Sequence, residues 1–179
     1  AAKGSGTVVT GTLTGGELAT GDAVEVVGET RHPARIRAIQ SLGRGVERIG
    51  PGHRVALNLG GIDHDDAARG DAVVHPGRWR PTRRVDASLD VLTSLDHEVS
   101  RRGAYAAYLG SGEYPVKVRV LGADALSPGT TGLVRLHLAT ALPLLPGDRY
   151  ILREAGRNET VGGGEILDIA PVRPASKAR

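Results

Sequence analysis

The feature that most constrains how this chain folds is the alternation of short runs rich in β-branched residues with turns rich in glycine, proline and aspartate. The runs recur about every 8–12 residues, a spacing typical of antiparallel sandwiches and barrels. The first run, Thr7–Leu13, has glycines on both sides, where tight turns or close backbone approach are expected. No stretch has a convincing helical period, and residues 63–68 are the one candidate for a helical turn.

These runs fall into two groups, and each group predicts one small barrel. The expected strands of the first group are Thr7–Leu13, Ala23–Val27 and residues 34–39, 46–49, 54–59 and 71–75. Those of the second group are residues 84–92, 104–109, 116–121, 132–138, 149–153 and 164–169. The fold class that follows is all-β, with two consecutive small antiparallel β-barrels.

The boundary between the two barrels is expected within residues 75–82. The two prolines and the glycine of this stretch cannot continue a hydrogen-bonded ladder. At 179 residues the chain is long enough for two small domains. We therefore predict a first barrel at residues 1–77, a linker at 78–82, a second barrel at 83–172 and a frayed basic tail at 173–179.

The composition excludes several classes of protein. Without cysteine there are no disulfides, no thiolate catalysis and no cysteine-ligated zinc, and a cytoplasmic location fits. No run approaches the roughly 18 apolar residues of a membrane span, so no membrane contact is expected. The chain has no methionine and begins almost within a strand, and we therefore expect it to be a piece of a longer protein.

The charge balance mildly favours a polyanionic partner. The formal net charge is +3, and nearly all of the positive charge comes from arginine. Arginine can form paired hydrogen bonds with phosphate or carboxylate and can stack on bases. A high-GC genome, which encodes arginine where others encode lysine, explains the same bias, and composition alone leaves both explanations open.

Motifs for catalysis and cofactor binding are weak. Residues 4–7 superficially resemble a phosphate-binding loop, but they precede a strand rather than a helix, and the Walker pattern is absent. The acidic residues at 63–66 carry hard oxygen ligands, but their spacing matches no known metal-binding loop, so a solvated turn is favoured. We therefore expect no catalytic residue, no metal and no cofactor in this chain.

Three stretches indicate contact with solvent or a ligand. A period of two places Arg54 and Asn58 on one face of their strand, opposite the core, which suits an anion or simply a solvated face. Residues 162–164 are three glycines, which suit close approach to a sugar-phosphate backbone or a bulge at a barrel corner. His137, between two leucines, is expected to face solvent or a partner.

Together these segments resemble the two β-barrel domains that follow the GTPase domain in translation elongation factors. The resemblance to their second domain lies in residues 4–11, 21–22, 35–40, 51–59 and 69–71. Residues 149–153 and 160–164 resemble the close of their third domain. Within that superfamily, residues 54–59, 110–113 and 162–168 are most similar to selenocysteine-specific elongation factors. The resemblance covers essentially the whole chain.

The resemblance implies a fragment that binds selenocysteinyl-tRNA within a factor that delivers it to the ribosome in a GTP-dependent manner. GTP and magnesium would belong to the absent GTPase domain, and an mRNA hairpin would belong to another absent domain. The positions that match the family's aminoacyl pocket are Arg54 and Asn58. An arginine there suits a selenol, which is mostly ionised at neutral pH. Other pocket residues of the family would lie before Ala1.

The resemblance also implies contacts with the acceptor and T stems of the tRNA. The third domain would hold the T stem through residues 105–113 and 157–164. The contact residues expected from this match are Arg35, Arg37, Tyr105, Tyr108, Ser111, Gly112, Arg157, Thr160, Gly162 and Gly163. Tyr108 stands where relatives often carry histidine.

Three other functions stay open at this point. The same two domains could come from another translational GTPase, which selectivity for selenocysteinyl-tRNA over its seryl precursor would decide. The barrels could form a structural pair without direct tRNA contact. A small enzyme using the acidic turn at 63–66 with Arg54 is the third, and metal-dependent thermal stabilisation would support it.

Overall fold

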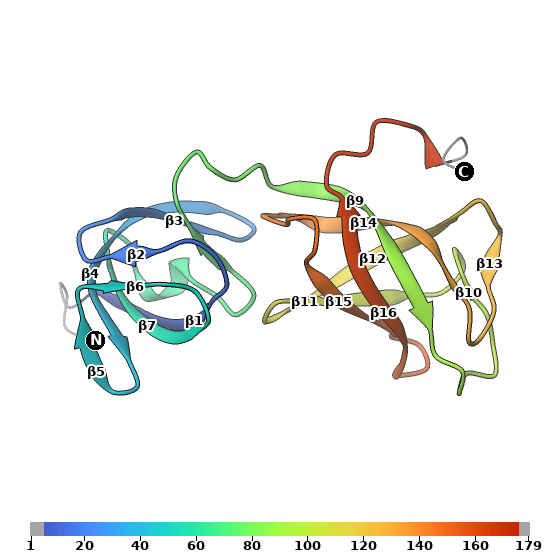
Figure 1. Ribbon diagram of the computed structural model, residues 1–179. Coiled ribbons are helices and arrows are strands. Elements are labelled where there is room, and N and C mark those ends of the chain that lie inside the picture. The colour runs from blue at the N-terminus through green and yellow to red at the C-terminus, as the bar shows by residue number, and fades with distance from the viewer. Residues whose placement is uncertain (1–5, 176–179) are drawn as a thin grey trace. The chain divides into compact units, whose positions relative to one another are not determined.

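The computed structural model describes residues 6–175, so residues 4–5 of the first glycine-rich stretch and 176–179 of the expected tail lie outside it. The described chain consists of β-strands joined by turns, with one 3-10 helix (Figure 1). It divides between Trp79 and Arg80 into two compact units, each with its own core. The predicted fold class is confirmed.

The first unit is an antiparallel sheet that curls on itself. Its strands are β1 (Thr7–Leu13), β2 (Leu18–Ala19), β3 (Ala23–Val27), β4 (Arg31–Ser41), β5 (Arg44–Val46), β6 (Arg48–Ile49), β7 (His53–Gly60) and β8 (Ala72–Val74). The main sheet has the order β1-β7-β4-β3-β8, with β5 paired to β4, and β2 and β6 form a separate pair. The helical turn predicted at 63–68 is confirmed as the 3-10 helix His64–Asp66.

A bulge in β4 shapes the centre of this sheet. Ile36 pairs with Leu59 and Ala38 with Asn58, so Arg37 is an extra residue on β4. Arg37 and Ala38 are therefore both exposed, and the buried positions resume at Ile39. The alternation of β7 is as predicted, because Val55, Leu57 and Leu59 are buried while Arg54 is exposed.

The second unit is a closed barrel. Its strands are β9 (Thr82–Val91), β10 (Val99–Ser100), β11 (Tyr105–Leu109), β12 (Gly112–Leu121), β13 (Ala125–Leu126), β14 (Thr131–Leu142), β15 (Arg149–Glu154) and β16 (Glu159–Asp168). The barrel has the order β11-β12-β14-β9-β16-β15, and β10 pairs with β13 at one end (Figure 1). Its core is aliphatic except for tyrosines, as a chain without phenylalanine and methionine requires.

Two sequence predictions differ from the structure. The run 46–49 was expected to be one strand, but it divides between β5, which forms a hairpin with β4, and β6, which pairs with β2. The glycines at 162–164 lie inside β16 rather than in a loop, with register shifts on either side of them. A Cβ at Gly162 or Gly164 would collide with the backbone of β9, so close strand packing requires glycine there.

Candidate functional site

The outward face of β1, β7 and β4 places Arg54 among small polar side chains. Arg54 lies opposite Thr12 in the β1–β7 pairing, and its Nη2 donates a hydrogen bond to Oγ1 of Thr10 at 3.4 Å. Among residues 6–175, no carboxylate lies within ion-pair distance of this guanidinium. The arginine predicted for the aminoacyl pocket therefore keeps most of its donors available for an added anion.

The other predicted residues of the first unit lie along the same sheet. Asn58 is half-buried between Val8 and Ala38, four residues from Arg54 along β7. The side chain of Arg37 crosses over Gly60, where a Cβ would collide with it. Arg35 donates from Nη1 to the backbone oxygen of Gly21 at 2.8 Å. The structure thus places Arg54 and Asn58 on the same face of β7, and the cross-strand pairing of Asn58 brings it beside Arg37 on β4.

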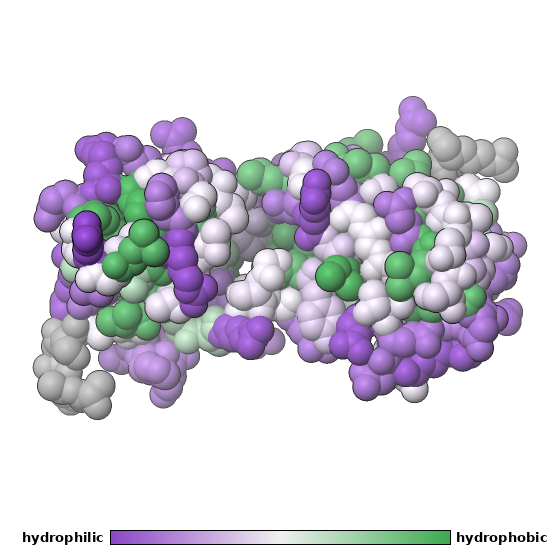
Figure 2. Space-filling view, turned by 60° about the horizontal axis from the view of Figure 1, so that its bottom comes forward, coloured by the Kyte–Doolittle hydropathy of each residue, from purple (hydrophilic) through white to green (hydrophobic). Residues whose placement is uncertain are grey.

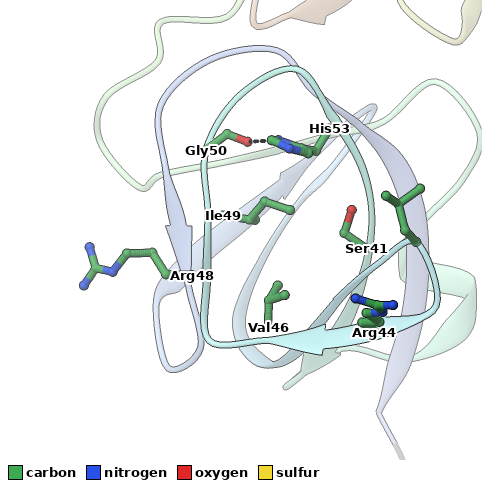
Figure 3. A pocket seen from close by; sticks show the side chains of 8 residues that line it. Ser41, Arg44, Val46, Arg48, Ile49, Gly50 and His53 are labelled. Atoms are coloured by element: carbon green, nitrogen blue, oxygen red, sulfur yellow. Dashed lines mark hydrogen bonds between the residues drawn. The ribbon is translucent and has the colours of Figure 1, made fainter.

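An open hollow borders the start of β7 (Figure 3). Val46 and Ile49 form its apolar floor, and Arg48 points away from it, towards its ion-pair partner Glu17. Nδ1 of His53 donates a hydrogen bond to the backbone oxygen of Gly50 at 3.1 Å. Sequence reasoning missed this hollow, because it forms only where the β4–β5 hairpin folds over the two-stranded β2–β6 piece.

In the second unit, Tyr108 lies in a row of polar side chains. Its ring centroid is 5.9 Å from the guanidinium carbon of Arg153, which is a cation–π distance. Hydrogen bonding to Glu113, its cross-strand neighbour on β12, raises the pKa of the Tyr108 phenol. Arg153 in turn donates to both oxygens of Asn158, at 2.9 and 3.0 Å. Tyr108 is thereby held in one place on the barrel surface.

The remaining predicted contacts differ in how far they reach solvent. Ser111 and Thr160 are exposed, and Gly163 is half-buried. Tyr105, Gly112 and Gly162 are covered by the barrel itself. The hydroxyl of Tyr105 accepts a hydrogen bond from the backbone nitrogen of Ser100 at 3.2 Å, and burial raises the pKa of its phenol. The predicted T-stem surface therefore consists of fewer accessible residues than the sequence match implies.

Arg157 lies within an acidic cluster, which the sequence did not reveal. Its Nη1 is 3.8 Å from Asp96 Oδ1, and its Nε is 3.6 Å from Glu154 Oε2. The same two carboxylates bind His97, through Nδ1 at 2.9 Å and Nε2 at 2.8 Å. Because both ring nitrogens face carboxylates, with Asp96 the larger influence, the pKa of His97 is raised. These residues are up to 61 positions apart in the chain, from Asp96 to Arg157, so no local motif signals them.

The carboxylates of the acidic turn at residues 63–66 hold the turn itself. Oδ2 of Asp66 accepts a hydrogen bond from the backbone nitrogen of Asp63 at 2.9 Å. Its Oδ1 lies 3.5 Å from Nδ1 of His32. Within the described chain, no group of three or more potential metal ligands comes together. No helix in residues 6–175 is long and apolar enough to cross a membrane.

The described surfaces carry hydrophobic side chains only in small groups on the face that Figure 2 shows, separated by hydrophilic residues.

The class of protein follows from the two barrels and from comparison with known families. A model described as "Elongation factor Tu domain 2" matches residues 6–74, the first unit. A model described as "Selenocysteine-specific elongation factor, beta-barrel domain" matches residues 83–173, the second unit. The chain is therefore a pair of translation-factor β-barrels.

Individual relatives narrow this class. The chain is 34% identical over 166 residues to the selenocysteine-specific elongation factor of Desulfomicrobium baculatum, covering 93% of this chain and 26% of that protein. It is 32% identical over 176 residues to elongation factor Tu 2 of Streptomyces avermitilis, covering 93% of this chain and 43% of that protein. The chain thus spans less than half the length of either relative. It belongs to the family of selenocysteine-specific elongation factors, SelB.

Proposed function

We propose that this chain is the part of a selenocysteine-specific elongation factor that holds selenocysteinyl-tRNA while the whole factor delivers it to the ribosome. GTP and magnesium would bind to a GTPase domain of the parent protein, and an mRNA hairpin to a further domain. The family membership supports the role in carrying tRNA. The environment of Arg54 is the observation that supports recognition of the attached amino acid.

Arg54 can bind an anion because nothing in its surroundings neutralises it. Its guanidinium donates a hydrogen bond to the hydroxyl of Thr10 and has no carboxylate within ion-pair distance among the described residues. A selenolate is anionic at neutral pH, whereas the hydroxyl of serine is neutral. A charge-assisted hydrogen bond from Arg54 would therefore favour the selenocysteinyl form over its seryl precursor.

The test is the affinity of this chain for three forms of one tRNA: selenocysteinyl, seryl and deacylated. We expect the selenocysteinyl form to bind most tightly and Arg54→Ala to weaken that form by about tenfold or more, as expected for loss of a hydrogen bond to a charged group. Binding of the other two forms should change little. Arg31→Ala removes an exposed arginine from the same sheet and serves as the matched control.

A second candidate is the same pair of barrels acting in a general elongation factor, which the match to elongation factor Tu supports. Equal affinity of the wild-type chain for selenocysteinyl- and seryl-tRNA would favour this candidate. Equal weakening of all three tRNA forms by Arg54→Ala would give Arg54 a role in binding the RNA instead of the amino acid. Absence of any tRNA binding would leave the barrels a structural role.

A further inference from the structure

The outward face of three neighbouring barrel strands carries basic side chains directly opposite one another. In the β12–β14–β9 pairing, Lys117 lies opposite His137, which lies opposite Arg84. One pair further along, Arg119 lies opposite Arg135. Basic side chains therefore gather on this face, and a bound anion would lower the repulsion between those that are charged.

Most of these cations have no acidic partner. Arg135 is paired with Asp86 through two hydrogen bonds, at 2.6 and 2.8 Å, and is 2% exposed. Lys117 and Arg119, in contrast, are exposed and have no ion pair or hydrogen bond within residues 6–175. The guanidinium of Arg84 donates to the backbone oxygen of Pro171 at 3.0 Å and has no ion pair within residues 6–175. We call Lys117, Arg119, His137 and Arg84 the basic strip.

His137 lies at the centre of the basic strip, between Lys117 and Arg84. Burial is the largest cause that lowers the pKa of its imidazole, and the charges of four neighbouring cations lower it further. These cations come from all three strands: Arg135 on β14, Arg84 on β9, and Lys117 and Arg119 on β12. Two acidic groups, Asp86 and Asp168, act on the buried Arg135, and Asp90, further along the outward face of β9, accepts a hydrogen bond from Thr131.

The segment after β16 adds to the positive charge. The backbone oxygen of Arg173 accepts a hydrogen bond from Nη1 of Arg135 at 2.6 Å, next to the contact between Pro171 and Arg84. The two contacts hold residues 171–173 beside the basic strip. The exposed side chain of Arg173 therefore supplies another cation there.

We propose that the basic strip binds the phosphate backbone of an RNA duplex, on a surface separate from the predicted T-stem residues at 105–113 and 157–164. The centre of the strip consists of long cationic side chains and one imidazole, with the exposed Leu133 only at its edge. A protein partner would instead require an apolar or aromatic centre from which lysine is depleted. Phosphate contacts need only cations that reach outward from a rigid support. The proposal rests on the proposed function only in taking the partner to be RNA.

The experiment measures how salt weakens the binding of this 179-residue chain to a labelled RNA duplex of arbitrary sequence. The test variant is Lys117→Gln combined with Arg119→Gln. The control, Arg44→Gln combined with Arg149→Gln, removes the same charge from exposed arginines that have no ion pair in the described chain. Near-unchanged thermal unfolding would show that both double variants keep the fold, since all four side chains are exposed.

We expect the strip variant to reduce the log–log salt slope by about 1.4–1.8, which corresponds to two lost phosphate contacts at about 0.7–0.9 each. The control should keep the wild-type slope. Equal slopes in the two double variants, or a strip variant with the wild-type slope, would overturn the proposal. Loss of binding to anionic phospholipid vesicles with an unchanged RNA slope would overturn it in favour of a membrane surface.

The two proposals fail in different ways. The dependence of duplex binding on salt does not involve the amino acid. A chain with no preference for selenocysteinyl-tRNA could therefore still show a smaller log–log salt slope in the Lys117→Gln, Arg119→Gln variant. If the chain discriminates selenocysteinyl- from seryl-tRNA but the strip variant keeps the wild-type salt slope, the proposed function stands and RNA binding by the basic strip is contradicted.

Discussion

Two outward-facing regions of the second barrel carry cations, and they differ in what surrounds them. At the β15–β16 turn, Arg157 lies between Asp96 and Glu154, at 3.8 and 3.6 Å. On β12, Lys117 and Arg119 meet other cations across the strands and no carboxylate in the described chain. An arginine whose charge is already balanced gains less from a phosphate than one whose charge is not. The comparison teaches that the position of carboxylates, more than the position of arginines, indicates where a polyanion would bind.

The largest expected effect concerns Arg135, which is the cation of the β12–β14–β9 face that forms an ion pair with Asp86. Asp86→Asn leaves a guanidinium that is 3% exposed without its carboxylate, and should lower the free energy of unfolding by about 3 kcal/mol or more. Urea denaturation of the chain measures this. Asp90→Asn on the same strand, where the carboxylate bonds only the hydroxyl of Thr131, is the control and should cost much less. Equal losses in the two variants would mean that Arg135 does not depend on Asp86.

A smaller effect should follow from releasing Arg157. Asp96→Asn removes a carboxylate that is 85% exposed and so leaves the fold intact, while Arg157 becomes more available to phosphate. Solvent screens an ion pair this exposed, so RNA affinity should rise only modestly, by at most about fivefold. Fluorescence anisotropy of a labelled duplex with the sequence of the tRNA T arm measures this change in affinity. The same gain in a variant that also carries Arg157→Gln would show that general charge, and not Arg157, is responsible.

The smallest effects are changes of stability with pH, and they should have opposite signs in the two regions. The pKa of His97 is raised, so its contribution to stability is complete below its ordinary pKa of about 6.5 and is lost as the pH rises through the folded-state pKa. The pKa of His137 is lowered, so stability falls as the pH drops below about 6.5.

Unfolding measured between about pH 5 and 8 tests this pair of expectations. His97→Gln should remove the loss of stability towards high pH, and His137→Gln the loss towards low pH. If both substitutions changed the pH dependence of the free energy of unfolding in the same direction, the expected opposite signs of the two regions would be contradicted. His64→Gln, at an exposed histidine of the first unit, controls for the substitution itself.

The sequence predicted the parts of this molecule that local pattern governs. The alternation along β7 correctly separated buried from exposed positions, because a strand reverses its side chains at every residue. The turn signals located most strands to within a few residues. The prediction that His137 faces outward is also confirmed.

What the sequence could not predict depends on contacts between distant segments. The division of residues 46–49 between β5 and β6 follows from two different pairing partners. The cluster around His97 joins residues from the β9–β10 loop to both ends of the β15–β16 turn, and the basic strip exists only in the register of three strands. The roles of Arg54, Asn58 and the expected tRNA contacts stay predictions, which the binding experiments above would decide.

The three glycines of β16 have a consequence for how this barrel can fail. At Gly162 and Gly164 the backbone of β9 occupies the space that a Cβ would need, so the wall closes there without any side chain between strands. A single added methyl group would push β16 away from β9 and leave both with unpaired hydrogen-bonding edges. Free strand edges recruit other chains, and the expected outcome is self-association rather than a merely looser barrel. We therefore expect the glycines that allow β16 to pack against β9 also to protect the barrel from aggregation.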